Sequence, residues 1–247
     1  MVDSPLAVVT GGGHRLGRAF IMSLAEHGYG VLLHYYQSSR QAKITIGRVS
    51  KFDVPVFSFQ GDLRNPLQVE NLFKFVDTLL ASPDSGLSHL SVLVNSAAHF
   101  SPVEARKLSV AEWDTTMDLN LRGPFLCAQQ AALRMPKGGL IVNVTDIGAQ
   151  RTWSRFPAYS VSKAGLEALT RVLARSLAPA IRVNAIAPGL VLPSESIPSS
   201  EWKKLTEKLP MKRLAKPEEV ASALEYLINN QYVTGQTIVV DGGYSLI

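Results

Sequence analysis

Three features of the 247-residue sequence predict a doubly wound, Rossmann-type α/β fold, with a seven-stranded parallel sheet covered by helices on both faces. Short apolar runs alternate with longer helical patterns along the whole chain. Most of these runs are apolar throughout, as strands buried on both faces of a parallel sheet require. A glycine-rich turn follows the first run and opens a helix, which is the arrangement of a dinucleotide-binding turn.

The strand candidates share this continuous apolar character and are separated by segments of helical periodicity. We expect strands at residues 6–10, 29–36, 54–60, 90–97, 139–145, 181–188 and 237–243, and helices at 16–27, 66–81, 109–135, 158–177 and 217–228. No break in composition divides the chain, so we expect one domain over residues 1–247. A Pro/Ser-rich segment follows the sixth strand. We expect a substrate lid there, near residues 188–210, because ligands bind beyond the carboxyl ends of such strands.

Composition and charge exclude several classes of protein. With 46% hydrophobic and 18% charged residues, the chain can bury a large core, and no apolar run is long enough to span a membrane. We find no export signal and expect a cytoplasmic protein, and Cys127, the single cysteine, lies in an apolar run typical of a buried side chain. The net charge of +5 suits an anionic nucleotide, whereas no basic stripe interleaved with aromatic residues predicts a nucleic-acid partner. We expect no membrane partner and no bound metal.

The segment TGGGHRLG joins the first strand to the first helix. Free N–H groups at such a helix start, together with the helix dipole, favour a pyrophosphate. Cofactor contacts are therefore expected from Gly11, His14, Arg15, Leu16 and Gly17.

The end of the second strand distinguishes NADP from NAD. An acidic residue about 20 positions beyond the glycine turn usually holds the free 2′-hydroxyl of NAD. The corresponding segment here, residues 32–40 with the sequence LLHYYQSSR, contains no acid. Hydroxyl, imidazole and guanidinium groups can instead hydrogen-bond to a 2′-phosphate. We therefore expect NADPH/NADP, held by His34, Tyr35, Tyr36, Ser38 and Ser39, with Arg15 projecting from the glycine turn toward the extra phosphate.

Small and polar residues end the later strands. Asp62, in the segment GDL, is expected to accept from the adenine amino group, with Leu63 beside it. Asn95 and Ala97, in NSAA, lie where small residues let the backbone approach the cofactor closely. The remaining expected cofactor contacts are Thr145, Pro188, Gly189 and Leu190, at the ends of the fifth and sixth strands.

The segment YSVSK places Tyr159 and Lys163 four residues apart, on the same face of a predicted helix. An ammonium group near a phenol favours the phenolate and lowers the tyrosine pKa. The pair therefore predicts a general acid–base site, with Tyr159 as the acid. Both residues are also expected to contact the cofactor.

Taken together, these segments resemble the short-chain dehydrogenase/reductase family over nearly the whole chain. The segments TGGGHRLG, GDL, NSAA, DLNLRGPF, YSVSK, AIAPG and VTGQTIVVDGG occur in the family's order and at its spacing. The resemblance implies hydride transfer from a nicotinamide, with Tyr159 as proton donor, Lys163 on the nicotinamide ribose and Asn120 supporting a proton relay through water. A structural role for Asn120, as a bend in its helix, stays open. The resemblance also implies a homotetramer built through long-helix and C-terminal contacts.

Two departures from the common pattern make the chain similar to the pteridine reductase branch of that family, and to dihydromonapterin reductases. Asp146 stands thirteen positions before Tyr159, in the zone of the usual catalytic serine, and Arg15 stands in the glycine turn. The branch reduces pterins and folates with NADPH. It implies substrate contacts from Arg15, Phe100, Asp146 and Tyr159, with Phe100 stacked on the pterin ring. Arg151, Trp153 and Phe156 are in the loop that would line the same site.

The aspartate suits a pterin substrate because a carboxylate accepts hydrogen bonds from ring N–H and amino groups. Two other functions stay open. The first is NADPH-dependent reduction of a carbonyl substrate, such as a 3-oxoacyl thioester or a sugar ketone, with Asp146 merely filling the place of the serine. The second is a cofactor-binding regulator without turnover, against which the complete set of Tyr159, Lys163 and Asn120 argues.

Overall fold

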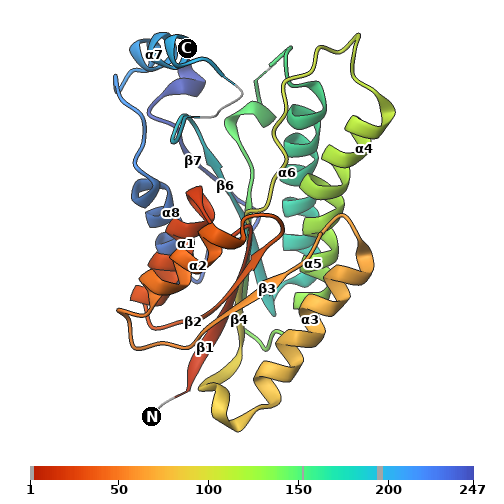
Figure 1. The fold of residues 1–247 in the computed structure, drawn as a ribbon, viewed down its shortest axis with the longest axis vertical. Coiled ribbons are helices and arrows are strands. Elements are labelled where there is room, and N and C mark those ends of the chain that lie inside the picture. Colours follow the sequence, from red (N-terminus) through yellow and green to blue (C-terminus); the bar gives the residue numbers. More distant parts are fainter. Residues whose placement is uncertain (1–2, 152, 194–196) are drawn as a thin grey trace.

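The predicted strands form one parallel sheet in the computed structural model, which describes residues 3–151, 153–193 and 197–247. The strands are β1 (Ser4–Thr10), β2 (Gly30–Tyr35), β3 (Val56–Gln60), β4 (Leu87–Asn95), β5 (Gly139–Val144), β6 (Ile181–Pro188) and β7 (Thr237–Val240). Their order is β3-β2-β1-β4-β5-β6-β7, and every neighbouring pair is parallel (Figure 1). The doubly wound Rossmann-type fold predicted from the sequence is confirmed.

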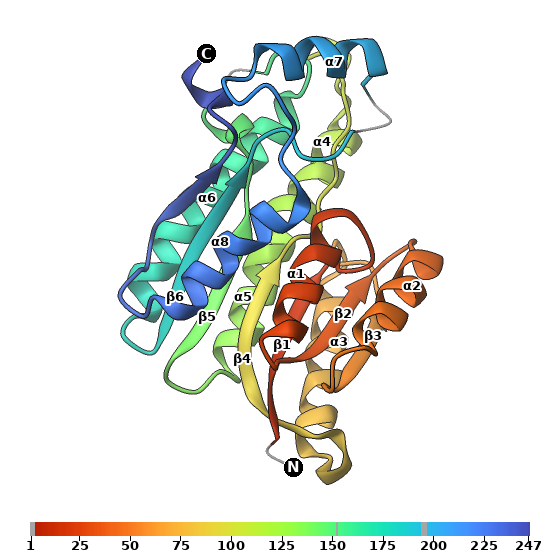
Figure 2. The same cartoon turned by 90° about the vertical axis from the view of Figure 1, so that its left-hand side faces the viewer.

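Helices cover both faces of the sheet, as Figures 1 and 2 show. They are α1 (Arg15–Glu26), α2 (Ser39–Val49), α3 (Pro66–Ala81), α4 (Val110–Met117), α5 (Gly123–Ala132), α6 (Pro157–Leu177), α7 (Ser199–Lys208) and α8 (Pro217–Asn229). Helix α1 packs between α2 and α8 on one face, while α5 packs between α3 and α6 on the other. In the part of the chain that the structure describes, no helix combines the length and apolar character needed to cross a membrane.

The core is divided into two layers by the sheet, and β1 contributes to both. Ala7 and Val9 pack with α1 and α8, whereas Leu6 and Val8 face the layer of α3 and α5. All four side chains are fully buried. Because alternate side chains of a strand point to opposite faces, a strand between two helical layers must be apolar at every position.

The helices differ from the expected ones in two respects. The continuous helix expected at residues 109–135 is α4 and α5 joined by a π-helical turn, η2 (Asp118–Arg122), which contains the buried Asn120. Helices α2 and α7 were not predicted, because both are polar on average and bury few side chains. The expected irregular lid therefore contains a helix, α7.

The carboxyl ends of the strands meet at one edge of the sheet, and β1 lies there between β2 and β4. The winding of the chain reverses at this point, which is where ligands bind in open α/β sheets. The buried Thr10, the last residue of β1, ties the two central strands together. Its hydroxyl oxygen accepts from the backbone N–H groups of Ser96 (3.0 Å) and Ala97 (3.1 Å), directly after β4.

Replacing Thr10 tests this tie. In the Thr10→Val variant the N–H groups of Ser96 and Ala97 lose their acceptor, which costs about 1–3 kcal/mol for each donor that stays buried and unpaired. We expect the free energy of unfolding to fall by an amount in this range, measured by urea denaturation. Thr10→Ser keeps the oxygen and is the matched control. Equal stabilities of the valine and serine variants would contradict the role given to the hydroxyl.

Candidate active site

The glycine turn of residues 11–14 lies at the carboxyl edge of the sheet, and steric contacts explain its small residues. A Cβ at Gly17 would lie 2.1 Å from the carbonyl oxygen of Gly11, so helix α1 packs directly against the turn. Gly11 has a φ of +65°, and a Cβ there would lie 2.8 Å from the Cα of Ala97. These contacts place the N-terminus of α1 beside the end of β4.

The start of α1 fits the diphosphate of a dinucleotide. His14 is the N-cap residue, yet its side chain makes no capping hydrogen bond, and the first turn carries no acidic residue. The helix therefore presents uncapped N–H groups and a positive dipole end without a competing carboxylate. Leu16, also expected as a cofactor contact, is partly buried against the core layer of α1.

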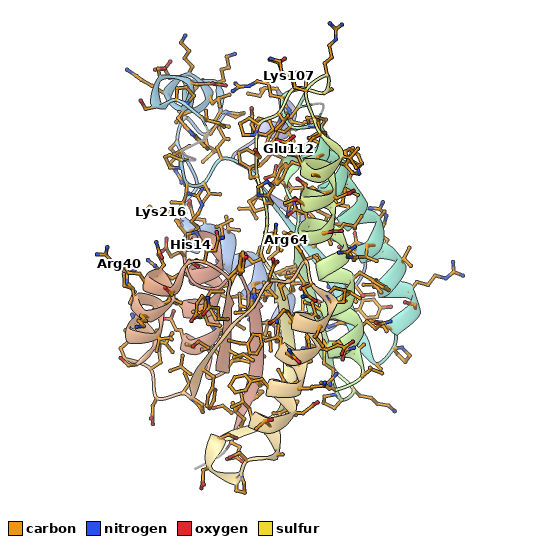
Figure 3. The ribbon with its side chains drawn as sticks, turned by 45° about the vertical axis from the view of Figure 1, so that its right-hand side comes forward. His14, Arg40, Arg64, Lys107, Glu112 and Lys216 are labelled. Atoms are coloured by element: carbon orange, nitrogen blue, oxygen red, sulfur yellow. The ribbon has the colours of Figure 1, made fainter. Side chains whose placement is uncertain are left out.

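The start of α2 provides a second group of donors beside the turn. Ser38 is its N-cap residue without a side-chain capping bond, and its hydroxyl lies next to Gly13, where an added Cβ would come within 2.9 Å of it. Ser39 is exposed, as are Arg40 and Tyr36, whereas Tyr35 is partly buried. Figure 3 shows His14 and Arg40 near one another on the same side of the molecule. These polar and basic groups, with no acid in the first turn of α2, suit an additional phosphate.

His34 has a different position from the one expected. Its ring is buried between strands and accepts from the N–H of Gly11 through Nδ1 (3.3 Å), while Nε2 lies 2.9 Å from the carbonyl oxygen of Gly61. Burial lowers the pKa of His34 to about 4, so the ring is neutral and its Nε2–H donates to Gly61. Because both nitrogens are occupied, the imidazole supports the glycine turn and does not face a phosphate, which corrects the expectation from the sequence.

Arg15 also differs from the expectation. It has a φ of +52°, a conformation that costs a non-glycine residue about 1 kcal/mol. Its guanidinium does not project toward Ser38 and Ser39; it donates to the carbonyl oxygens of Leu192 and Pro193, both at 2.9 Å. The glycine turn is thereby connected to the segment after β6, where the sequence predicts a lid.

Asp62 is engaged by a residue that the sequence analysis did not single out. Arg64 binds both carboxylate oxygens, with a shortest distance of 2.6 Å, and lies 5.7 Å from the centre of the Tyr36 ring. This ion pair holds the pKa of Asp62 below its usual value. The carboxylate keeps lone pairs for an adenine amino group, and Arg64 is an additional planar cation at that end of the site. The sequence DLR, in which Arg64 follows Asp62 by two positions, was the signal that could have predicted this ion pair.

Several expected cofactor contacts face the protein interior. Leu63 is a member of the core layer around α3. The Asn95 amide donates to Asn143 Oδ1 (2.9 Å), and the Thr145 hydroxyl donates to the carbonyl oxygen of Ile186 (3.2 Å). Pro188 is a buried end of β6, Gly189 packs against Asp241, and Leu190 belongs to the lid core.

Tyr159 and Asp146 form the centre of the candidate site. The Tyr159 hydroxyl donates to Asp146 Oδ2 (2.9 Å), while Asp146 Oδ1 accepts from the N–H of Gly148 (2.7 Å). Burial raises the pKa of Asp146 to about 6. Burial, followed by the charge of Asp146, raises the pKa of Tyr159 well above its usual value. The phenol is therefore protonated, and its proton points at a carboxyl group that itself titrates near neutral pH.

Lys163 lies beneath this pair on α6. Its ammonium group donates to the carbonyl oxygen of Val144 (2.7 Å) and lies 5.7 Å from the centre of the Tyr159 ring. Burial lowers the pKa of Lys163 to about 8, against the opposing effect of Asp146. The sequence analysis expected this ammonium to lower the pKa of Tyr159. The pKa of Tyr159 is instead raised, by burial and by Asp146.

The side chain of Asn120 fixes the backbone of His99 by hydrogen bonds. Its Oδ1 accepts from the N–H of His99 (2.7 Å), and its Nδ2 donates to the carbonyl oxygen of His99 (2.9 Å) and to Ser162 Oγ (3.1 Å). The π-helical turn η2 positions this side chain, so the alternative of a helix irregularity at Asn120 has structural support. These hydrogen bonds fix the backbone of the residue that precedes Phe100.

Aromatic rings form one wall of the site. Phe100 stacks on Phe156 at 4.5 Å between ring centres, and its other neighbour, Tyr159, meets it at 4.8 Å and 82°. Trp153 meets Phe156 at 6.1 Å. One face of Phe100 is thus covered by Phe156. The expected stacking of Phe100 on a substrate ring is restricted to the opposite face, and Phe156 and Trp153 support it from behind.

Comparison with known proteins identifies the family. The family model described as enoyl-(acyl carrier protein) reductase matches residues 13–245. The chain belongs to the short-chain dehydrogenase/reductase family. It is 32% identical to the 3-oxoacyl-[acyl-carrier-protein] reductase FabG of Staphylococcus epidermidis over 244 residues, which covers 96% of this chain and 97% of the relative. It is 31% identical to the 3-oxoacyl-[acyl-carrier-protein] reductase of Synechocystis over 248 residues, 98% of this chain and 97% of the relative.

Solved structures of the family include similar folds with a bound nucleotide. FolM alternative dihydrofolate reductase 1 from Brucella canis, complexed with NADP, has a TM-score of 0.90 and 32% identity, covering 100% of this chain and 96% of that one. A short-chain dehydrogenase from Burkholderia cenocepacia in complex with NADP has a TM-score of 0.90 and 26% identity, covering 98% of both chains. This short-chain reductase is thus an oxidoreductase whose cofactor is NADP(H). The uncapped starts of α1 and α2 and the absence of an acid after β2 fit that cofactor.

The pKa of Asp146 predicts how the stability of this short-chain reductase changes with pH. A carboxyl whose pKa rises from 3.8 to about 6 on folding binds more protons in the native state, so its contribution to stability is lost as pH rises through this window. Asp146→Asn removes the charge but keeps an acceptor for Gly148 and a partner for Tyr159. We expect the free energy of unfolding of the variant, relative to the wild type, to increase by about 2 kcal/mol between pH 4.5 and pH 7, measured by urea denaturation. A difference that does not change with pH would show that Asp146 has an ordinary pKa.

Proposed function

We propose that this short-chain reductase transfers hydride from NADPH to a pterin-type substrate, such as dihydrobiopterin or dihydromonapterin, or a biopterin or folate. The observation that carries the proposal is the carboxylate of Asp146, hydrogen-bonded to the hydroxyl of Tyr159. Reducing a C=N bond of a pterin requires a proton donor and recognition of neighbouring ring N–H and amino groups. A carboxylate accepts from such groups, whereas a ketone or thioester has none to offer.

Bound NADPH supplies the hydride, and the chain's own residues handle orientation and the proton. Tyr159 is the proton donor, since its raised pKa keeps it protonated at neutral pH. Asp146 holds the phenol through its hydrogen bond and, with a pKa of about 6, can return a proton to it after donation. Lys163, fixed on the Val144 carbonyl, places a positive charge beside the cofactor end of Tyr159. Phe100, with one face on Phe156, would stack on a flat substrate ring with the other.

Reduction of a carbonyl substrate is the second candidate, and the sequence relatives favour it. Curated relatives at 30–32% identity are 3-oxoacyl-[acyl-carrier-protein] reductases, whereas solved structures at 32% identity are named FolM alternative dihydrofolate reductases. Overall similarity thus fits both substrates equally. Asp146 favours the pterin, because a buried carboxylate beside the reacting oxygen of a ketone would repel its developing negative charge.

We also propose a homotetramer assembled through the long helices and the C-terminal end. Large apolar side chains are exposed on both surfaces: Val110, Phe125, Leu133, Val161 and Val172 along α4 to α6, and Val239, Leu246 and Ile247 at β7 and beyond. Clusters of this kind mark contacts between proteins. The mass in solution, from sedimentation velocity, tests the assembly.

A substrate panel tests the proposed activity. With NADPH in excess, we expect kcat/KM for a dihydropterin to exceed that for a 3-oxoacyl thioester by at least about 100-fold. The Asp146 carboxylate accepts a hydrogen bond from the pterin, whereas it repels the negative charge that develops on the thioester's carbonyl oxygen. Oxidation of NADPH is followed by absorbance. Tyr159→Phe, which keeps the packing on Phe100, is the control. It should abolish turnover of the pterin and leave the affinity for NADPH, measured by fluorescence, unchanged. Equal or faster turnover of the thioester would overturn the proposal.

A further inference from the structure

Strands β2 and β3 end side by side at the carboxyl edge of the sheet, next to the glycine turn. Tyr35 and Gln60, the last residues of the two strands, are partners in the sheet register. The ring of His34 connects this edge to the turn, because it accepts from the N–H of Gly11 (3.3 Å) and donates to the carbonyl oxygen of Gly61 (2.9 Å). In a Rossmann-type fold, residues beyond the second strand contact the adenosine ribose of the dinucleotide. The adenosine half of NADP(H) is therefore expected at this edge.

Arg64, just beyond the end of β3, is held firmly at this edge. Its Nε and Nη2 groups donate to both carboxylate oxygens of Asp62, at distances of 2.6–3.0 Å. Its backbone is also anchored: the N–H donates to Asp62 Oδ1 (3.0 Å), and the carbonyl oxygen accepts from Arg122 of η2 (2.9 Å). Arg122 is itself paired with Asp118 (2.8 Å). The plane of the Arg64 guanidinium is thus fixed by the chain's own contacts.

The guanidinium of Arg64 is accessible and lies beside an aromatic ring. Its Cζ is 5.7 Å from the centre of the ring of Tyr36, the residue directly after β2. The side chain of Arg64 is 36% exposed and Tyr36 is 43% exposed, so a ligand can reach both. Figure 3 shows Arg64 and His14 at nearly the same height, near the upper ends of the strands. Arg64 therefore belongs to the edge of the sheet that binds the nucleotide.

The contacts of Arg64 suit a flat base better than a phosphate. The carboxylate of Asp62 offsets the charge of the guanidinium and would itself repel an anion. A phosphate requires positive charge and free donors, whereas the ion pair occupies one donor edge of the guanidinium. Guanidinium planes stack on aromatic rings and on the bases of nucleotides. Adenine is the one base of the cofactor.

We propose that Arg64 is a cofactor-binding residue whose guanidinium plane stacks on the adenine base of NADP(H). The 2′-phosphate is then left to the start of α2, where Ser38, Ser39 and Arg40 stand without an acid in the first turn. Two different groups thus recognise the two parts of the adenosine half, the base by its flat surface and the phosphate by its charge. The inference concerns the cofactor alone and does not depend on which substrate is reduced.

Binding measurements on the purified protein test the inference. Arg64→Ala should raise the Kd of NADPH and the Kd of NADH by the same factor, about tenfold, because both dinucleotides lose the stacking of one base. Arg64→Lys keeps a positive charge beside Asp62 but lacks the plane, so it should weaken both dinucleotides nearly as much. The Kd values are measured by the fluorescence of the reduced nicotinamide. Arg175→Ala, which removes an exposed arginine in the last turn of α6, is the matched control and should change neither Kd.

A fragment of the cofactor places the contact in the adenosine half. The probe is 2′,5′-ADP, which carries the adenine base without a nicotinamide and is titrated by displacement of NADPH. Arg64→Ala should weaken this fragment about tenfold as well. Should the alanine variant not fold, Arg64→Lys carries the same comparison.

Four results would overturn the inference. Weakening of NADPH and 2′,5′-ADP without weakening of NADH would show a contact with the 2′-phosphate. Full affinity in Arg64→Lys would show that only the charge beside Asp62 matters. An unchanged affinity for 2′,5′-ADP would place the effect outside the adenosine half, and unchanged affinities for all three ligands would show that Arg64 does not contact the cofactor.

Discussion

The hydrogen bond between Tyr159 and Asp146 is the interaction on which the chemistry proposed for this short-chain reductase depends. The phenol and the carboxyl group are both buried, and their oxygen atoms lie 2.9 Å apart. The hydrogen bond from Tyr159 opposes the rise that burial causes in the pKa of Asp146, whereas Asp146 raises the pKa of Tyr159, so one proton is kept between them. Burial alone makes two such groups costly, so the surrounding chain must hold them. Gly148 holds the carboxyl group, and Phe100, itself stacked on Phe156, packs against the ring of Tyr159. Asn120 fixes the backbone beside Phe100.

The parallel sheet supplies the framework for this pair. Asp146 follows β5 directly, and Tyr159 lies in the first turn of α6, which packs on β6. The cofactor end is built at the neighbouring strand ends, where Thr10 joins β1 to the segment after β4. Arg15 and Tyr244 reach the lid from opposite ends of the sequence, through the carbonyls of residues 192 and 193 and through the Leu190 core. The segment after β6, the predicted lid, thus contacts the glycine turn and the C-terminal turn of Tyr244–Leu246, and Arg151 connects the C-terminal turn to the loop after Asp146.

The architecture could be predicted because a parallel sheet covered on both faces requires continuous apolar strands. Such strands can be recognised in the sequence alone. The helices α2 and α7 were missed, because both are polar on average and bury few side chains. Directions of side chains were harder still. His34 and Arg15 both stand at positions typical of phosphate contacts, yet one supports the turn from inside the sheet and the other points to the lid. The effect of Lys163 on Tyr159 was misjudged because spacing along a helix reveals neither burial nor the charge of Asp146.

In the proposed function Asp146 selects a nitrogen heterocycle over a carbonyl substrate, and a single substitution tests this role most directly. Asp146→Ser replaces the carboxylate by the hydroxyl that is usual in the family. The measurement is the ratio of kcat/KM for a dihydropterin to that for a 3-oxoacyl thioester, in the wild type and in the variant. We predict that the ratio falls at least about 100-fold, through loss of pterin turnover and gain of thioester turnover. A ratio that stays the same would show that the carboxylate does not choose the substrate.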